Sequence, residues 1–214
     1  LYLGMIGAFL ASVFWRPTVG LYVLAFALPM QTGRYKIHTF LLGSQFVDLL
    51  ILGAILGLLI KGQRVIPETS WSKFLLAFAA FYYFSLWEGS FFIGAPLPLW
   101  IDDLRFSDWN NYVEMFLLAL VVASAFKDKA QVKWLLITMA LAVMVVNRNY
   151  YGLLSGRDLS HFSYDVRDAG LLGYAGVNGF AAFEVMFSSF LLGLYSFIKS
   201  RLLKLGILFL LGTS

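Results

Sequence analysis

Cysteine is absent from this sequence, and charge is scarce. The absence of cysteine excludes disulfide bonds, thiolate catalysis and metal sites with cysteine ligands. Only 13% of the residues are charged, whereas 60% are hydrophobic, and the mean hydropathy is +0.79. A soluble domain of this length carries more charge and could not bury so many long apolar runs in one core. The composition therefore predicts an integral membrane protein.

Metal-binding patterns are also missing. The sequence has two histidines and contains neither a His-Glu-x-x-His nor an Asp-x-Asp motif, so we expect no metal and no cofactor. Asp102 and Asp103 form an acidic pair, which we interpret as part of a solvated loop. A net charge of +4 could indicate a nucleic-acid partner, but the basic residues lie in short connections between apolar runs. We therefore interpret them as topology signals and expect a lipid bilayer, not nucleic acid, as the partner.

Apolar runs recur along the whole chain and predict an all-α polytopic integral membrane protein. They favour about eight transmembrane or membrane-embedded helices in a single domain, residues 1–214. Several runs are shorter than the roughly 20 residues of a perpendicular membrane helix, so tilted, re-entrant or broken segments are expected. Since the last run is cut short, we expect the chain to continue past residue 214. The runs lie near residues 1–15, 18–30, 46–60, 71–87, 111–126, 133–147, 174–198 and from 204 onward.

The basic residues divide between alternate connections. Ten of the sixteen lie on one set, which the enrichment of Lys and Arg in cytoplasmic loops assigns to the cytoplasm. The other six, of which five are arginines, are then predicted to face outward. The first set is Arg16, Lys61, Arg64, Lys73, Lys127, Lys129, Lys133, Lys199, Arg201 and Lys204, and the second is Arg34, Lys36, Arg105, Arg148, Arg157 and Arg167.

The stretch 167–181 joins a charged outward connection to a long apolar run. Arginine suits multidentate recognition of phosphate, whereas the alternative is that Arg157 and Arg167 pair with neighbouring aspartates. Glycine recurs every third residue and lets the backbone approach a ligand closely. The stretch therefore predicts a site for a phosphorylated group at the outer membrane surface, supported by Gly170, Gly173, Gly176 and Gly179.

Three further polar residues belong to this candidate site. Asn178 and Glu184 enter the apolar run, where an unsatisfied polar group is costly, so each needs a ligand or a neighbouring helix as partner. Interhelical bonding is the alternative for both. His161 lies six residues before Arg167 and could approach the same candidate site. The alternative is that it is an ordinary surface histidine.

Small residues predict helix-packing faces elsewhere in the chain. The clearest pattern is Gly53-x-x-x-Gly57 in the third run. Asp48, at the start of that run, is expected to cap its helix or to pair with a basic residue of the preceding connection. Further packing faces are predicted at Gly4, Gly7, Ala8 and Ala11, and at Gly179, Ala182, Ser189 and Gly193.

Aromatic residues flank the outward acidic connection. We interpret them as an interfacial belt, with sugar stacking as the alternative. They include Phe81, Tyr82, Tyr83, Phe84, Trp87, Phe91, Phe92, Trp100, Phe106, Trp109 and Tyr112.

Two of these stretches resemble the O-antigen ligase and polymerase family. Residues 167–173, Arg-Asp-Ala-Gly-Leu-Leu-Gly, with 176–181, Gly-Val-Asn-Gly-Phe-Ala, look like the family signature Arg-x-x-Gly…Gly-x-Pro-Asn-x-x-Ala. Val177 stands where proline is usual. Residues 14–20, Phe-Trp-Arg-Pro-Thr-Val-Gly, are similar to the opening hairpin of these proteins, which include O-glycosylation ligases associated with exosortase systems. The chain fits the N-terminal portion of the family.

The resemblance implies a glycosyltransferase of the bacterial inner membrane. Such an enzyme moves a saccharide from an undecaprenyl-diphosphate-linked donor to a hydroxyl of a glycan, lipid or protein acceptor, on the periplasmic or exterior side. Arg167 matches the family arginine that stabilises the diphosphate, and Asn178 matches the motif asparagine. The second arginine and the catalytic histidine of the family would follow Ser214. The residues themselves leave two alternatives, a transporter of a small anion and a non-catalytic structural subunit of a membrane complex.

Overall fold

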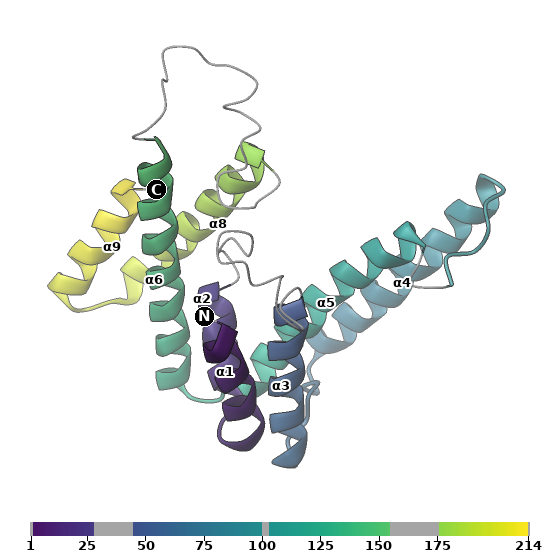
Figure 1. Ribbon diagram of the computed structural model, residues 1–214, viewed down its shortest axis with the longest axis horizontal. Coiled ribbons are helices and arrows are strands. Elements are labelled where there is room, and N and C mark those ends of the chain that lie inside the picture. The colour runs from purple at the N-terminus through teal and green to yellow at the C-terminus, as the bar shows by residue number, and fades with distance from the viewer. Residues whose placement is uncertain (1, 28–44, 100–102, 155–175, 214) are drawn as a thin grey trace, which may run out of the picture.

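The computed structural model describes residues 2–27, 45–99, 103–154 and 176–213. Within these ranges the chain forms eight α-helices and no strand (Figure 1). Each predicted apolar run corresponds to one helix, so the all-α fold is confirmed for this part of the chain. The helices are α1 (Tyr2–Phe14), α2 (Thr18–Ala27), α3 (Phe46–Ile60), α4 (Ser70–Phe92), α5 (Leu104–Ala125), α6 (Lys129–Leu154), α8 (Gly176–Phe197) and α9 (Arg201–Thr213).

Polar caps set the starts of α4 and α5, and hydropathy located the first of these but not the second. The α5 helix begins at Leu104, seven residues before the predicted run, because the Asp103 carboxylate accepts a hydrogen bond from the Arg105 backbone N–H at 2.9 Å. At the start of α4, the Thr69 hydroxyl accepts from the Ser72 N–H at 3.1 Å. Each cap satisfies a backbone donor that the first helical turn leaves free.

Two helices of the described chain are long and apolar enough to cross a membrane, namely Ser70–Phe92 and Lys129–Arg148. The other apolar helical segments are shorter, with 10–17 residues each. They are Tyr2–Phe14, Thr18–Ala27, Phe46–Ile60 and Val185–Ser196. By length and composition alone, two helices of the described chain therefore qualify as complete membrane spans.

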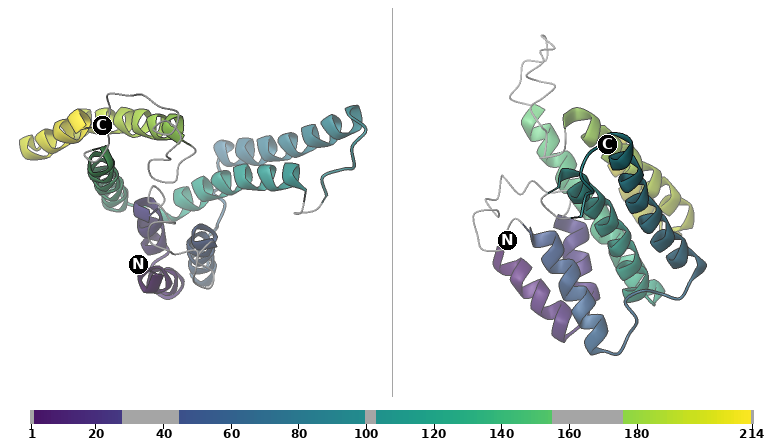
Figure 2. Two further views of the ribbon diagram at one scale, coloured as in Figure 1. Left: turned by 45° about the horizontal axis from the view of Figure 1, so that its top comes forward. Right: turned by 90° about the vertical axis from the view of Figure 1, so that its right-hand side faces the viewer.

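The main hydrophobic core lies where α1, α2 and α3 pack side by side against the end of α5 (Figures 1 and 2). Its central side chains, among them Leu21, Leu50 and Val121, are buried. The Tyr22 ring meets the Phe126 ring edge to face, with centroids 5.3 Å apart. The Tyr22 hydroxyl also donates to the Gln131 carbonyl at 3.1 Å, which fixes α2 against the first turn of α6.

Glycines allow α1, α2 and α3 to approach closely. A Cβ atom added at Gly53 would contact the Phe9 ring at 2.8 Å, and one added at Gly57 would overlap the Ser12 carbonyl. Gly20 lies equally close, because its N–H donates to the Ser12 hydroxyl at 2.6 Å. The packing role predicted for Gly53 and Gly57 is therefore confirmed.

Other predicted packing glycines face open space. A Cβ at Gly4, Gly7 or Gly193 would meet nothing within 4 Å, so the predicted packing role is wrong for these three in the described part of the chain. The α1 helix packs through Ala8, as predicted, and through Ser12, which was not predicted. The Ser189 hydroxyl is exposed and donates to the Val185 carbonyl of its own helix at 2.8 Å. Small size alone did not show which face of a helix meets a neighbour.

The α4 and α5 helices form an antiparallel pair that projects away from this core (Figures 1 and 2). The pair leaves large apolar side chains uncovered along α4. Phe81 is 70% exposed, Phe91 71% and Phe92 92%. Such side chains are expected to find an apolar partner outside the described chain.

Candidate functional site

Basic residues from all four basic connections line two hollows that share Lys127 and Asp128. Arg16, Lys61 and Lys127 come from the α1–α2, α3–α4 and α5–α6 connections, and they line one cavity of about 260 Å³. Lys127 also lines a larger groove of about 980 Å³, together with Lys199 from the α8–α9 connection. Basic residues of alternate connections, which are far apart in the sequence, thus lie close together in the structure. We call this region the basic end.

The connection that carries the predicted site has both of its anchor points at the opposite end (Figure 1). These anchors are the last residue of α6, Leu154, and the first residue of α8, Gly176. Five of the predicted site residues lie outside the described residues, namely Arg157, His161, Arg167, Gly170 and Gly173.

The second half of the predicted motif forms the start of α8. Gly176 is its first residue, and Asn178 and Gly179 follow within its first turn. The first backbone N–H groups of a helix have no intrahelical partner and carry partial positive charge, which suits an anion. Glu184 lies about 9 Å further along the helix axis and about 240° around it from Asn178. The side chains of Asn178 and Glu184 are not among those that the structure describes.

Arg105 is fully engaged in a structural clamp. Its Nε and Nη2 donate to the two Asp103 carboxylate oxygens at 3.0 and 2.6 Å. Its Nη1 donates to the Ser90 hydroxyl at 2.7 Å, and Nη2 also donates to the Pro96 carbonyl at 2.9 Å. These bonds tie the end of α4, the following connection and the start of α5 together. Asp103 is thus a helix cap and ion-pair partner, while Asp102 lies outside the described residues.

Acid should release this clamp. Hydrogen bonds from Arg105 and its positive charge hold the pKa of the Asp103 carboxyl below its usual range. A carboxyl whose pKa is lowered by folding adds stability above its unfolded pKa of about 3.9. That stability is lost as the pH falls through the lower folded value. Tryptophan fluorescence from Trp87 and Trp109, which lie on the clamped helices, should therefore change below about pH 4.

Two variants test this acid transition. Asp103→Asn keeps a capping side chain but removes the ion pair, so the transition should disappear. Asp108→Asn removes an exposed carboxyl from the next turn of α5 and should leave the transition in place. An unchanged transition in the Asp103→Asn protein would show that another carboxyl causes it.

Aromatic rings next to the clamp pack mainly on one another. The Tyr83 ring lies 4.8 Å from Trp109, 5.6 Å from Trp87 and 6.0 Å from Phe106, measured between centroids. The Trp109 indole N–H donates to the Ala79 carbonyl at 3.0 Å. These rings hold α4 against α5 and are not free for sugar stacking. That prediction stays untested for the exposed rings of the same region.

A pair of carboxyl groups joins α3 to α5. The Glu114 side chain lies within hydrogen-bonding reach of the Asp48 side chain. Asp48 is not the helix cap, which was one of its two predicted roles, since Gln45 occupies that position without a side-chain bond. The other role, a pair with Arg34 or Lys36, involves residues outside the described chain. The sequence signal for Glu114, a single carboxylate within the apolar run 111–126, was overlooked.

The described residues contain no group of three or more histidine, aspartate or glutamate side chains that could hold a metal ion. The chain matches no protein-family model, no curated protein and no solved structure. Functional inference therefore depends on the residues and on the arrangement of the helices.

Proposed function

We propose that this chain belongs to a multi-pass membrane glycan ligase or polymerase. It transfers a saccharide from an undecaprenyl-diphosphate-linked donor to an acceptor hydroxyl at the outer face of the bacterial inner membrane. One observation supports the proposal: basic residues of all four basic connections line two hollows that share Lys127, while the helix ends Leu154 and Gly176, which flank the stretch with Arg167, lie away from the three basic connections before α6.

Exposed apolar side chains support the membrane setting. Leu3 is 83% exposed and Phe14 76%, in addition to the phenylalanines of α4. Contiguous apolar surface of this kind is rare on soluble monomers, and a bilayer would cover it. With the basic end in the cytoplasm, the α6–α8 connection faces the periplasm or the exterior.

The chemistry requires stabilisation of a diphosphate leaving group. The acceptor oxygen attacks the anomeric carbon of the donor sugar, and the bond from that carbon to the diphosphate oxygen breaks. The bonding electron pair stays on the diphosphate, whose growing negative charge is stabilised by the Arg167 guanidinium and by the free N–H groups at the start of α8. The acceptor proton passes to a base that the family resemblance locates after Ser214.

Glycan transfer by membranes that contain the protein tests this function. Membranes with the unaltered protein should move the saccharide from the lipid-linked donor to the acceptor, and membranes with the Arg167→Ala protein should leave the donor unused. Equal transfer by both proteins would show that Arg167 takes no part in glycan transfer.

A transporter is the second candidate, and the Asp48–Glu114 contact favours it. Carboxyl side chains that lie together on apolar helices mark ion pathways in many membrane transporters. Glu114→Gln would then abolish proton-coupled anion uptake into vesicles. Under the ligase proposal the same variant retains glycan transfer.

A further inference from the structure

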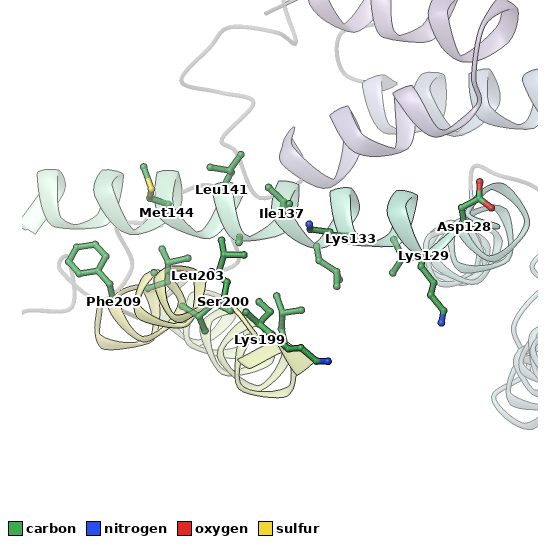
Figure 3. Close-up of a pocket in the computed structure, with 18 of the residues that line it drawn as sticks. Asp128, Lys129, Lys133, Ile137, Leu141, Met144, Lys199, Ser200, Leu203 and Phe209 are labelled. Carbon is green, nitrogen blue, oxygen red and sulfur yellow. The ribbon is translucent and has the colours of Figure 1, made fainter. Parts of the chain in front are cut away.

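The groove of about 980 Å³ combines a cationic end with apolar walls. It lies between α6 and α9, with the end of α8 as its third wall, and we call it the α6–α9 groove. Figure 3 shows Lys129, Lys133 and Lys199 toward one end of the groove and Met144 and Phe209 toward the other. Its size is at the upper limit of ligand pockets, which measure roughly 300–1,000 Å³.

The cationic end carries excess positive charge. Four lysines line the groove there, and Asp128 is the single carboxylate among the described lining residues. The ion pairs found in the described chain, Arg64 with Glu68 and Arg105 with Asp103, involve none of these lysines. An anionic ligand group would therefore meet a net attraction. The lysines are Lys127, Lys129, Lys133 and Lys199.

The apolar walls continue away from the lysines along one face of α6. Lining residues recur at spacings of three and one from Lys133 to Met144, the spacing of a single helix face. These two residues are eleven positions apart, about 16 Å along the helix axis. One leaflet of a hydrocarbon core about 30 Å thick has nearly the same depth.

We infer that the α6–α9 groove binds one anionic glycerophospholipid of the leaflet at the basic end. The phosphate and its anionic headgroup lie among the lysines, and the acyl chains lie along α6 and α9. Charge complementarity selects an anionic lipid, because basic residues at the cytoplasmic surface attract such headgroups. This inference depends on the membrane setting of the proposed function but not on glycan transfer.

Lipid binding to the purified protein in detergent micelles tests the inference by native mass spectrometry. Dioleoyl phosphatidylglycerol should bind with a stoichiometry of one, and dioleoyl phosphatidylcholine at least about tenfold more weakly. Lys133→Gln combined with Lys199→Gln should weaken phosphatidylglycerol binding roughly 30-fold, about fivefold for each lysine. Arg64→Gln combined with Lys73→Gln removes the same charge outside the groove and should leave binding unchanged.

A steric variant tests the apolar part separately. A Cβ at Gly206, which lines the groove, would meet nothing within 4 Å, so Gly206→Trp can fill the groove without a clash in its own helix. Gly212 is equally open but does not line the groove, so Gly212→Trp is the matched control. Bound phosphatidylglycerol should be lost from the Gly206→Trp protein and retained by the control.

Three results would overturn the inference. They are equal binding of the two lipids, full binding by the double lysine variant, and a dimer whose interface covers Gly206. The lipid-binding test contains no glycan donor, so its result does not depend on glycan transfer. A protein that binds phosphatidylglycerol in this test but transfers no saccharide in the membrane assay would refute the proposed function and leave the lipid site intact.

Discussion

Arg167→Ala should lower glycan transfer by about 10²- to 10³-fold, the usual cost of removing one donor that stabilises charge in a transition state. The lipid-linked donor should accumulate, because the step that transfers its saccharide and frees the undecaprenyl diphosphate is blocked. Arg167→Lys keeps the charge but not the planar, multidentate donor set, so it should restore only part of the activity.

Arg64→Ala is the matched control for this prediction. Arg64 is an exposed arginine at the basic end and pairs with Glu68 of the same connection. An exposed pair of this kind contributes at most about 1 kcal/mol to stability. Transfer should therefore stay near its normal level. Equal losses in the Arg64→Ala and Arg167→Ala proteins would indicate a general effect of charge removal and contradict a role in the site.

Gly57→Leu should disrupt the core formed by α1, α2 and α3. The new Cβ would overlap the Ser12 carbonyl, and a backbone atom cannot move aside without separating the helices. Overpacking of this kind costs roughly 3 kcal/mol. For a chain of this size that corresponds to a loss of about 6–12 °C in Tm, measured by thermal unfolding in detergent.

Gly7→Leu provides the comparison, because a Cβ at Gly7 meets nothing within 4 Å. Leucine also favours the helix more than glycine does, so stability should stay the same or rise slightly. A Tm for Gly57→Leu equal to that of Gly7→Leu would mean that α1 and α3 do not pack as described.

Helix positions were predictable wherever polar residues bound an apolar run. The third run, 46–60, coincides with α3, because Gln45 precedes it and Lys61 follows it. The α5 helix was predicted too short, since charged residues near its start lower the hydropathy there. The cap by Asp103 and its ion pair with Arg105 stabilise that first turn, and hydropathy does not register them.

Contacts between distant segments were harder to predict. The alternating charges of the connections predicted two sides, and the structure brings basic residues of all four basic connections to two hollows that share Lys127. No local pattern indicates that Glu114 lies beside Asp48, or that Ser12 contacts Gly20 and Gly57. Such contacts depend on how helices cross. The proposed role of Arg167 stays a prediction, because that residue lies outside the described chain.

Orientation in the membrane is the most direct test of the proposed site. Because the sequence contains no cysteine, an introduced cysteine is the single thiol that a reagent can label. Ser160→Cys places a single thiol in the α6–α8 connection, and Glu68→Cys places one at the basic end. In intact cells a membrane-impermeant maleimide should label the Ser160→Cys protein, and it should label the Glu68→Cys protein only after permeabilisation. Labelling of the Glu68→Cys protein alone in intact cells would put Arg167 in the cytoplasm and contradict a glycan-transfer site on the outer face.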